Sequence, residues 1–243
     1  MISNKIGFAM GVLKNGLVDF LSENRVNPNL ITFTGLTINF FAAASLAYGH
    51  NWLAGILMIF AGAFDILDGA VARKSGRVSS FGAFFDSVID RYSDLILYIG
   101  LITYYARIGA FGTVILTSVA SMGSILVSYT RARAENVIES CKVGFWERPE
   151  RIVLLIIAAL SNRLDRALWI LAIFANITVI HRMVYTWIQT TGEYEESTSD
   201  RKLLTTFFKI AFKDFKRETW QYDLYCIAVL LVMFGDKLIS YIF

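Results

Sequence analysis

The sequence predicts an all-α, polytopic membrane protein. Hydrophobic residues make up 56% of the 243 residues, and the mean hydropathy is +0.53. Several apolar runs are long enough to cross a bilayer, which takes about 20 residues of helix. The two cysteines, Cys141 and Cys226, lie far apart and outside any metal-ligand or redox pattern. These observations argue against a soluble core and favour a bundle of membrane-spanning helices.

We expect a six-transmembrane-helix bundle in the central part of the chain. The first four spans are predicted at residues 30–48, 52–72, 82–105 and 109–129. A polar loop at 130–150 precedes a short fifth helix at 151–161 and a sixth span at 168–188. Pro28 indicates a turn before the first span, and Pro149 suits the first turn of the fifth helix.

The two ends of the chain carry amphipathic patterns. Residues 5–21 predict an amphipathic N-terminal helix at the membrane interface, although an ordinary packed helix fits the pattern equally well. Residues 202–216 predict a second interfacial helix, and 225–234 predict an extra C-terminal hydrophobic helix that either spans or lies in the interface. The predicted segments are therefore a juxtamembrane segment at 1–26, a six-span domain at 27–190 and a C-terminal extension at 191–243.

The distribution of charge predicts the orientation in the membrane. If the amino terminus is cytoplasmic, segments 1–29, 73–81, 130–151 and 189–221 lie inside and carry nearly all the loop lysines and arginines. The opposite loops hold only Arg107, Arg163 and Arg166. Because cytoplasmic loops are enriched in Lys and Arg, the pattern predicts a multi-pass protein of the cytoplasmic (inner) membrane.

Acidic residues gather between two of the apolar runs. Asp65 and Asp68 share one face near the end of a predicted helix, and Asp86 and Asp90 share a face near the start of the next. The basic link between them contains Gly76, which favours a turn and hence a helix hairpin. Each ionisable group there costs roughly 2.5–3.5 kcal/mol on insertion scales, so a compensating charge is needed. Since carboxylates are hard oxygen ligands, the sequence predicts bound Mg²⁺.

This stretch resembles the signature of the CDP-alcohol phosphotransferases, D-x2-D-G-x2-A-R-x8-G-x3-D-x3-D. Every fixed position matches, at Asp65, Asp68, Gly69, Ala72, Arg73, Gly82, Asp86 and Asp90. A motif with this many fixed residues is specific. The resemblance spans roughly residues 25–190. It implies a phospholipid-synthesis enzyme that transfers a phosphatidyl group from CDP-diacylglycerol to an acceptor hydroxyl, at a site facing the cytoplasm, and releases CMP.

The resemblance also implies roles for individual residues. Two Mg²⁺ ions are expected, with Mn²⁺ as an alternative: one held by Asp65, Asp68 and Asp86, the other by Asp65, Asp86 and Asp90. Asp90 matches the general base that takes the proton from the acceptor hydroxyl. The positions that match CDP-lipid-binding residues are Asn29, Thr32, Gly69, Arg73 and Ser79. Relatives also suggest a homodimer.

A second informative stretch is basic. The segments S-Y-T-R-A-R-A-E at 128–135 and G-F-W-E-R-P-E-R at 144–151 most resemble the family's prokaryotic phosphatidylinositol-phosphate synthases. This implies inositol phosphate as the acceptor, in a basic pocket of Arg131, Arg148, Arg151 and Arg182. A solvated loop that obeys the positive-inside rule is the alternative. Arg131 stands where that subfamily often has Lys, and a planar fork could alter the acceptor's fit.

Other functions stay open. The catalytic motif does not separate inositol phosphate from inositol, glycerol phosphate or serine as the acceptor. A cation transporter is a candidate of another class, but transporter sites usually lie near the midplane between repeats, and no repeat is visible here. The expected partners are CDP-diacylglycerol, a polyol phosphate and membrane lipids, and no nucleic acid.

Overall fold

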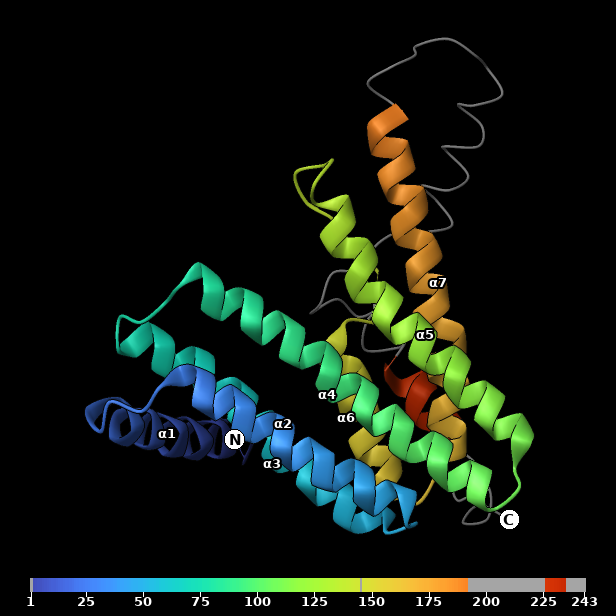
Figure 1. Cartoon of the computed structure of the whole chain (residues 1–243), viewed down its shortest axis with the longest axis horizontal. Coiled ribbons are helices and arrows are strands. Elements are labelled where there is room, and N and C mark those ends of the chain that lie inside the picture. The colour runs from blue at the N-terminus through green and yellow to red at the C-terminus, as the bar shows by residue number, and fades with distance from the viewer. Residues whose placement is uncertain (1, 145, 192–225, 235–243) are drawn as a thin grey trace. The chain divides into compact units, whose positions relative to one another are not determined.

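The computed structural model describes residues 2–144, 146–191 and 226–234, and all regular structure in these ranges is helical. The helices are α1 (Ile2–Glu23), α2 (Pro28–Ala47), α3 (Asn51–Lys74), α4 (Ser80–Arg107), α5 (Phe111–Ala134), α6 (Arg148–Leu160) and α7 (Leu164–Thr191), shown in Figure 1. Residues 226–234 form a further helix. The predicted all-α class is confirmed. The chain divides into two compact units, Met1–Tyr104 and Tyr105–Phe243.

Four of these helices, α2, α3, α5 and α7, are long and apolar enough to cross a membrane. The 28 residues of α4 are also long enough, but the helix carries Asp86, Asp90, Arg91 and Asp94. The 13 residues of α6 are short for a full span. The chain is therefore a membrane protein, and the count of six spans stays a prediction.

The predicted ends of the chain are only partly described. The amino-terminal segment is helical as expected, in α1. The predicted amphipathic helix at 202–216 lies outside the described residues. Most of the predicted C-terminal hydrophobic helix, 226–234, is helical. Three features remain predictions. They are the interfacial position of α1, the division of the chain into segments 1–26, 27–190 and 191–243, and a membrane span at 226–234.

In the first unit, α2 and α3 lie side by side (Figure 1) and α1 packs on α3. Val18 of α1 belongs to one buried cluster with Leu67 and Val71 of α3. The backbone of α4 touches α2, since a Cβ added at Gly100 would lie 2.3 Å from the Ala43 carbonyl oxygen. Only glycine permits that approach, so α4 lies close to α2 at this point.

Local capping sets where the helices of this unit begin. The side chain of Asn27 accepts a hydrogen bond from the Asn29 N–H at 3.0 Å, and Pro28 occupies the first turn of α2. Side-chain oxygens at this position satisfy an otherwise unpaired helix N–H. Gly76, in the turn between α3 and α4, has a φ of 65°, as the predicted turn requires. Ser79 then accepts from the Gly82 N–H at 3.0 Å at the start of α4.

In the second unit, α5 and α7 lie side by side (Figure 1), and Val127 of α5 packs with Ala175 and Val179 of α7. The prediction of a loop from residue 130 was wrong, because α5 continues to Ala134. Arginine and alanine are strong helix formers, and basic side chains favour the last turn of a helix. Helix α6 begins at Arg148 rather than at residue 151, with Pro149 in its first turn as predicted.

Candidate active site

The α3–α4 hairpin of the first unit brings acidic side chains together. Asp65, near the end of α3, and Asp86 and Asp90, near the start of α4, each place a carboxylate oxygen within 4.8 Å of the others. All three side chains are half-buried. Like charges so close disfavour one another unless a cation lies between them. The group of carboxylates therefore fits the hard-oxygen site that a divalent cation prefers.

Asp68 lies outside this group of three carboxylates. It is 6% exposed, and one of its carboxylate oxygens accepts a hydrogen bond from the Thr32 hydroxyl of α2 at 2.6 Å. Its other carboxylate oxygen accepts from the Gly69 N–H. Asp86 and Asp65 still act on Asp68 electrostatically. The hydroxyl of a neighbouring helix thus engages the one motif aspartate that the carboxylate group leaves out.

A cavity of about 300 Å³ opens beside the hairpin within the first unit. Its lining includes all the predicted CDP-lipid-binding residues, namely Asn29, Thr32, Gly69, Arg73 and Ser79. Asp68 and Asp86 also line it, so Asp86 belongs both to the cavity and to the carboxylate group. The cavity therefore adjoins the place where a cation would be held.

Glycine leaves room for the arginine of the cavity. A Cβ added at Gly69 would lie 3.3 Å from Arg73 Nη1, in tight contact with the guanidinium. The sequence interpretation missed a second arginine, Arg77, which lines the same cavity and donates from Nη1 to the Arg25 carbonyl at 3.0 Å. The basic link after Arg73 could have pointed to Arg77, but Arg77 stands at none of the fixed positions of the motif. The two guanidinium groups make the cavity suitable for a phosphate-containing ligand.

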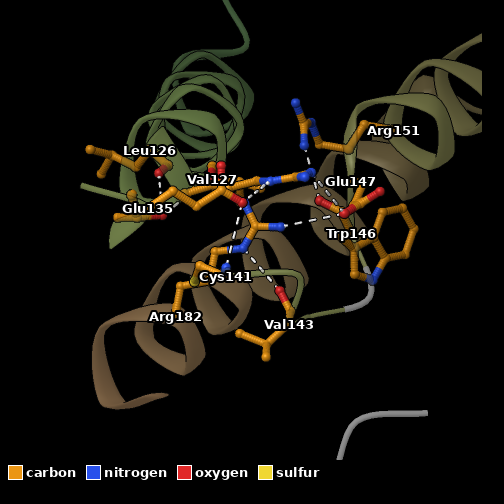
Figure 2. Close-up of polar contacts among 11 residues, drawn as sticks. Leu126, Val127, Glu135, Cys141, Val143, Trp146, Glu147, Arg151 and Arg182 are labelled. Atoms are coloured by element: carbon orange, nitrogen blue, oxygen red, sulfur yellow. Dashed lines mark hydrogen bonds and ion pairs between the residues drawn. The ribbon is translucent and has the colours of Figure 1, made fainter. Parts of the chain in front are cut away.

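Two of the predicted basic residues of the second unit, Arg131 and Arg182, form ion pairs with Glu147, and Figure 2 shows Arg182 and Arg151 near it. Arg131 Nη1 lies 3.3 Å and Arg182 Nη2 lies 3.8 Å from Glu147 Oε1. Arg151 donates from Nη1 to the Trp146 carbonyl at 3.0 Å. Arg151 and Arg182 are each 1% exposed, whereas Arg148, the first residue of α6, is half-buried. The residues that share these contacts, Arg131, Arg151, Arg182 and Glu147, are called the arginine cluster below.

Glu135, at the end of α5, contacts Arg131 of the arginine cluster. Its carboxylate accepts from Arg131 Nε at 3.0 Å, and this hydrogen bond holds the pKa of Glu135 below its usual range. Glu135 and Glu147 therefore both form ion pairs with Arg131. The sequence interpretation assigned neither of them a role, although each stands within a few residues of the predicted arginines.

The fold and the α3–α4 hairpin define a class of protein: a helical membrane protein with a carboxylate group beside an arginine-lined cavity. A model of the family described as CDP-alcohol phosphatidyltransferase matches residues 25–195. The chain belongs to this family of enzymes, which confirms the resemblance drawn from the motif.

Several proteins similar to this chain are named for the phospholipid that they make. Archaetidylinositol phosphate synthase of Methanothermobacter thermautotrophicus is 38% identical over 177 residues, which are 70% of this chain and 88% of that protein. The crystal structure of Mycobacterium tuberculosis phosphatidylinositol phosphate synthase with CDP-DAG bound matches with a TM-score of 0.67 and 29% identity, covering 72% of this chain and 93% of that one. A second structure of that enzyme, in complex with manganese and citrate, matches with a TM-score of 0.66 and 29% identity, covering 72% and 88%.

Proposed function

We propose that this protein transfers a phosphatidyl group from CDP-diacylglycerol to inositol phosphate, giving phosphatidylinositol phosphate and CMP. The observation that carries the proposal is the position of Asp86. It lines the cavity that holds all the predicted donor-binding residues and also belongs to the carboxylate group. A diphosphate bound in the cavity would therefore reach the cation site. Solved and curated relatives named as synthases of inositol phospholipids support this reaction.

The cavity offers the groups that a CDP-lipid needs. Arg73 and Arg77 provide forked donors for the diphosphate. Gly69 and Gly82 line the cavity without side chains, so that a bound ligand can approach the backbone. Asn29, Thr32 and Ser79 supply polar groups from the starts of α2 and α4. We assign these residues to the donor.

The carboxylates would hold the metal ions. Asp65, Asp86 and Asp90 form the group that the structure brings together, and Asp68 would join Asp65 and Asp86 at a first ion. Bound there, Mg²⁺ or Mn²⁺ would polarise the phosphoryl oxygens and offset the charge that develops during transfer. The manganese complex of the mycobacterial enzyme supports a divalent cation in this family.

Asp90 is the proposed general base. Its carboxylate takes the proton of the acceptor hydroxyl as that oxygen attacks the β-phosphorus of the donor. The bond between the β-phosphorus and the bridging oxygen then breaks, and CMP leaves. The side chain of Asp90 is 16% exposed, so its carboxylate lies at the boundary between solvent and the α3–α4 hairpin.

The arginine cluster, together with Arg148, is the proposed acceptor site. Guanidinium groups pair with phosphate through two parallel hydrogen bonds, which gives both affinity and orientation. Buried guanidinium groups such as those of Arg151 and Arg182 are rare outside paired or ligand-binding positions. The positive-inside pattern predicts that segment 130–151 faces the cytoplasm, where such a site would take a soluble phosphorylated polyol. A homodimer is also proposed, by analogy with the family.

Replacing Arg131 with alanine is expected to raise the KM for inositol phosphate at least about tenfold, because a hydrogen bond between charged groups contributes roughly 1.5–3 kcal/mol. Arg131 is 35% exposed, so its loss leaves no buried hole. The KM for CDP-diacylglycerol should stay within about twofold, since a factor of two is a small free-energy change. Initial rates of CMP release measure both constants.

The matched control is Arg133→Ala, because Arg133 lies on the same last turn of α5 but is exposed. It should leave both KM values unchanged. Equal increases in the two KM values for Arg131→Ala would remove the assignment of this residue to the acceptor.

A second donor is favoured by one comparison. The relative that shares 38% identity is named for an archaetidyl product rather than a phosphatidyl one, so an archaeal lipid donor is the alternative. Membership of a transferase family favours group transfer over the cation transporter considered from the sequence.

The test supplies the purified protein, in vesicles, with one of two donors, CDP-diacylglycerol or a CDP-activated archaeal lipid. Each donor is paired in turn with inositol phosphate, inositol, glycerol phosphate or serine. Release of CMP is measured for each pair. The proposal expects rapid release with CDP-diacylglycerol and inositol phosphate. Release with another acceptor alone, or with none of them, would refute it.

A further inference from the structure

We infer that Glu147 competes with the phosphate of the acceptor for the arginine cluster, so that a phosphorylated polyol must displace its carboxylate in order to bind. This inference rests on the proposed assignment of the arginine cluster to the acceptor. It names a residue that sets the affinity for the acceptor, lies outside the aspartate motif and makes no direct contribution to the transfer itself.

Glu147 bridges two arginines from different helices. A single oxygen, Oε1, lies 3.3 Å from Arg131 Nη1 of α5 and 3.8 Å from Arg182 Nη2 of α7. Figure 2 shows Glu147 beside the Arg182 guanidinium. The side chain of Glu147 is 28% exposed while that of Arg182 is 1% exposed. The carboxylate therefore lies on the solvent side of a buried cation, where an incoming acceptor would meet it.

The bonding of Arg182 leaves one nitrogen available to a ligand. Nε donates to the Val143 carbonyl at 2.9 Å, and Nη1 donates to the Val127 carbonyl. Nη2 is buried and makes no hydrogen bond within the described residues, since Glu147 lies at ion-pair distance only. A buried donor without a hydrogen bond is costly, and a phosphate oxygen would satisfy it. Arg182 is thus incompletely paired with Glu147 and suited to a stronger anion.

The charges of the competing groups decide which acceptors can enter. A phosphate monoester carries about −1.5 to −2 charges and three acceptor oxygens near neutral pH, so it can replace one carboxylate and also engage Nη2. The hydroxyl groups of a neutral polyol cannot replace a carboxylate beside a buried guanidinium, because that cation would lose its counter-charge. The ion pairs of Glu147 must be broken before a phosphate can bind, so Glu147 lowers the affinity of the arginine cluster for the acceptor.

The test compares Glu147→Gln with the wild-type full chain in vesicles. Glutamine keeps the size of the side chain and removes its charge. The KM for inositol phosphate should fall about fivefold or more, as expected when a partly buried ion pair no longer has to be broken. Glu139→Gln is the matched control, because Glu139 is an exposed glutamate of the same segment between α5 and α6, and it should leave this KM unchanged.

Glu147→Asp keeps the charge and should retain a KM for inositol phosphate near that of the wild type. An unchanged KM in Glu147→Gln would overturn the inference. An equal fall of the KM in Glu147→Asp would also overturn it, because shape rather than charge would then be responsible. Thermal unfolding of each variant shows whether the fold is retained.

Calorimetric binding of inorganic phosphate separates this inference from the proposed transfer. Tighter phosphate binding by Glu147→Gln supports the role of Glu147 even if the wild type releases no CMP with any acceptor, a result that would refute the transfer alone. Weaker phosphate binding by Glu147→Gln would overturn the role of Glu147 whatever the transfer assay shows.

Discussion

Replacing Asp90 with asparagine is expected to lower the rate of CMP release by about 10³-fold or more, because positioned general bases contribute roughly 10²–10⁴-fold. Asparagine cannot accept the proton of the acceptor hydroxyl, and it removes one of the three carboxylates that lie within 4.8 Å of one another. Binding of the CDP-lipid should change little, since the residues that line the cavity include Asp86 but not Asp90. Single-turnover CMP release and donor binding measure the two effects separately.

A suitable control for the loss of a carboxylate is Asp165→Asn, in the exposed first turn of α7. It should release CMP at the wild-type rate. Normal turnover by Asp90→Asn, or loss of donor binding along with turnover, would show that Asp90 is not the base.

Removal of divalent cations is expected to stop CMP release completely and reversibly. The half-buried carboxylates of Asp65, Asp86 and Asp90 concentrate negative charge at one end of the α3–α4 hairpin. Without a cation they would repel the diphosphate of the donor as well as one another. Excess EDTA should therefore abolish the activity, and added Mg²⁺ or Mn²⁺ should restore it.

The control for chelation is the same reaction with EDTA already saturated by Mg²⁺, which should run at the full rate. Undiminished turnover in excess free EDTA would rule out the metal-dependent mechanism and leave the carboxylates without their proposed function.

The grouping of the acids could be predicted from the sequence because local rules determine it. Asp86 and Asp90 are one helical turn apart, and Gly76, with its φ of 65°, provides the turn that folds α3 back on α4. The position of Asp68 could not be predicted in this way. Its partner Thr32 is 36 residues away and meets it only because α2 packs on α3.

The second unit shows where pattern reading was insufficient. Arg131 was expected in a loop, but helix propensity extends α5 to Ala134 and brings Arg131 within reach of Glu135, one turn later. Arg182 is held by tertiary contacts with the carbonyls of Val143 and Val127, and buried Arg151 donates to the carbonyl of Trp146 just before α6. Neither burial nor the pairing with Glu147 is encoded in the local spacing of basic residues.

The spans illustrate a different limit. Composition identifies α2, α3, α5 and α7 as candidate spans, but α4 carries the aspartates of the site in its first half. A helix that holds charged functional groups loses the apolar pattern by which spans are recognised. In α4 the charged residues therefore weaken the composition signal of a span, whereas α3 keeps that signal although it carries Asp65 and Asp68.

The most direct test of the account is anomalous X-ray scattering from crystals of this protein grown with Mn²⁺. The account predicts a strong anomalous peak among the carboxylates of Asp65, Asp86 and Asp90, and loss of that peak in Asp90→Asn or a marked reduction. Ordered carboxylates with no peak between them, in crystals where Mn²⁺ is bound elsewhere, would contradict the claim that the α3–α4 hairpin is a cation site.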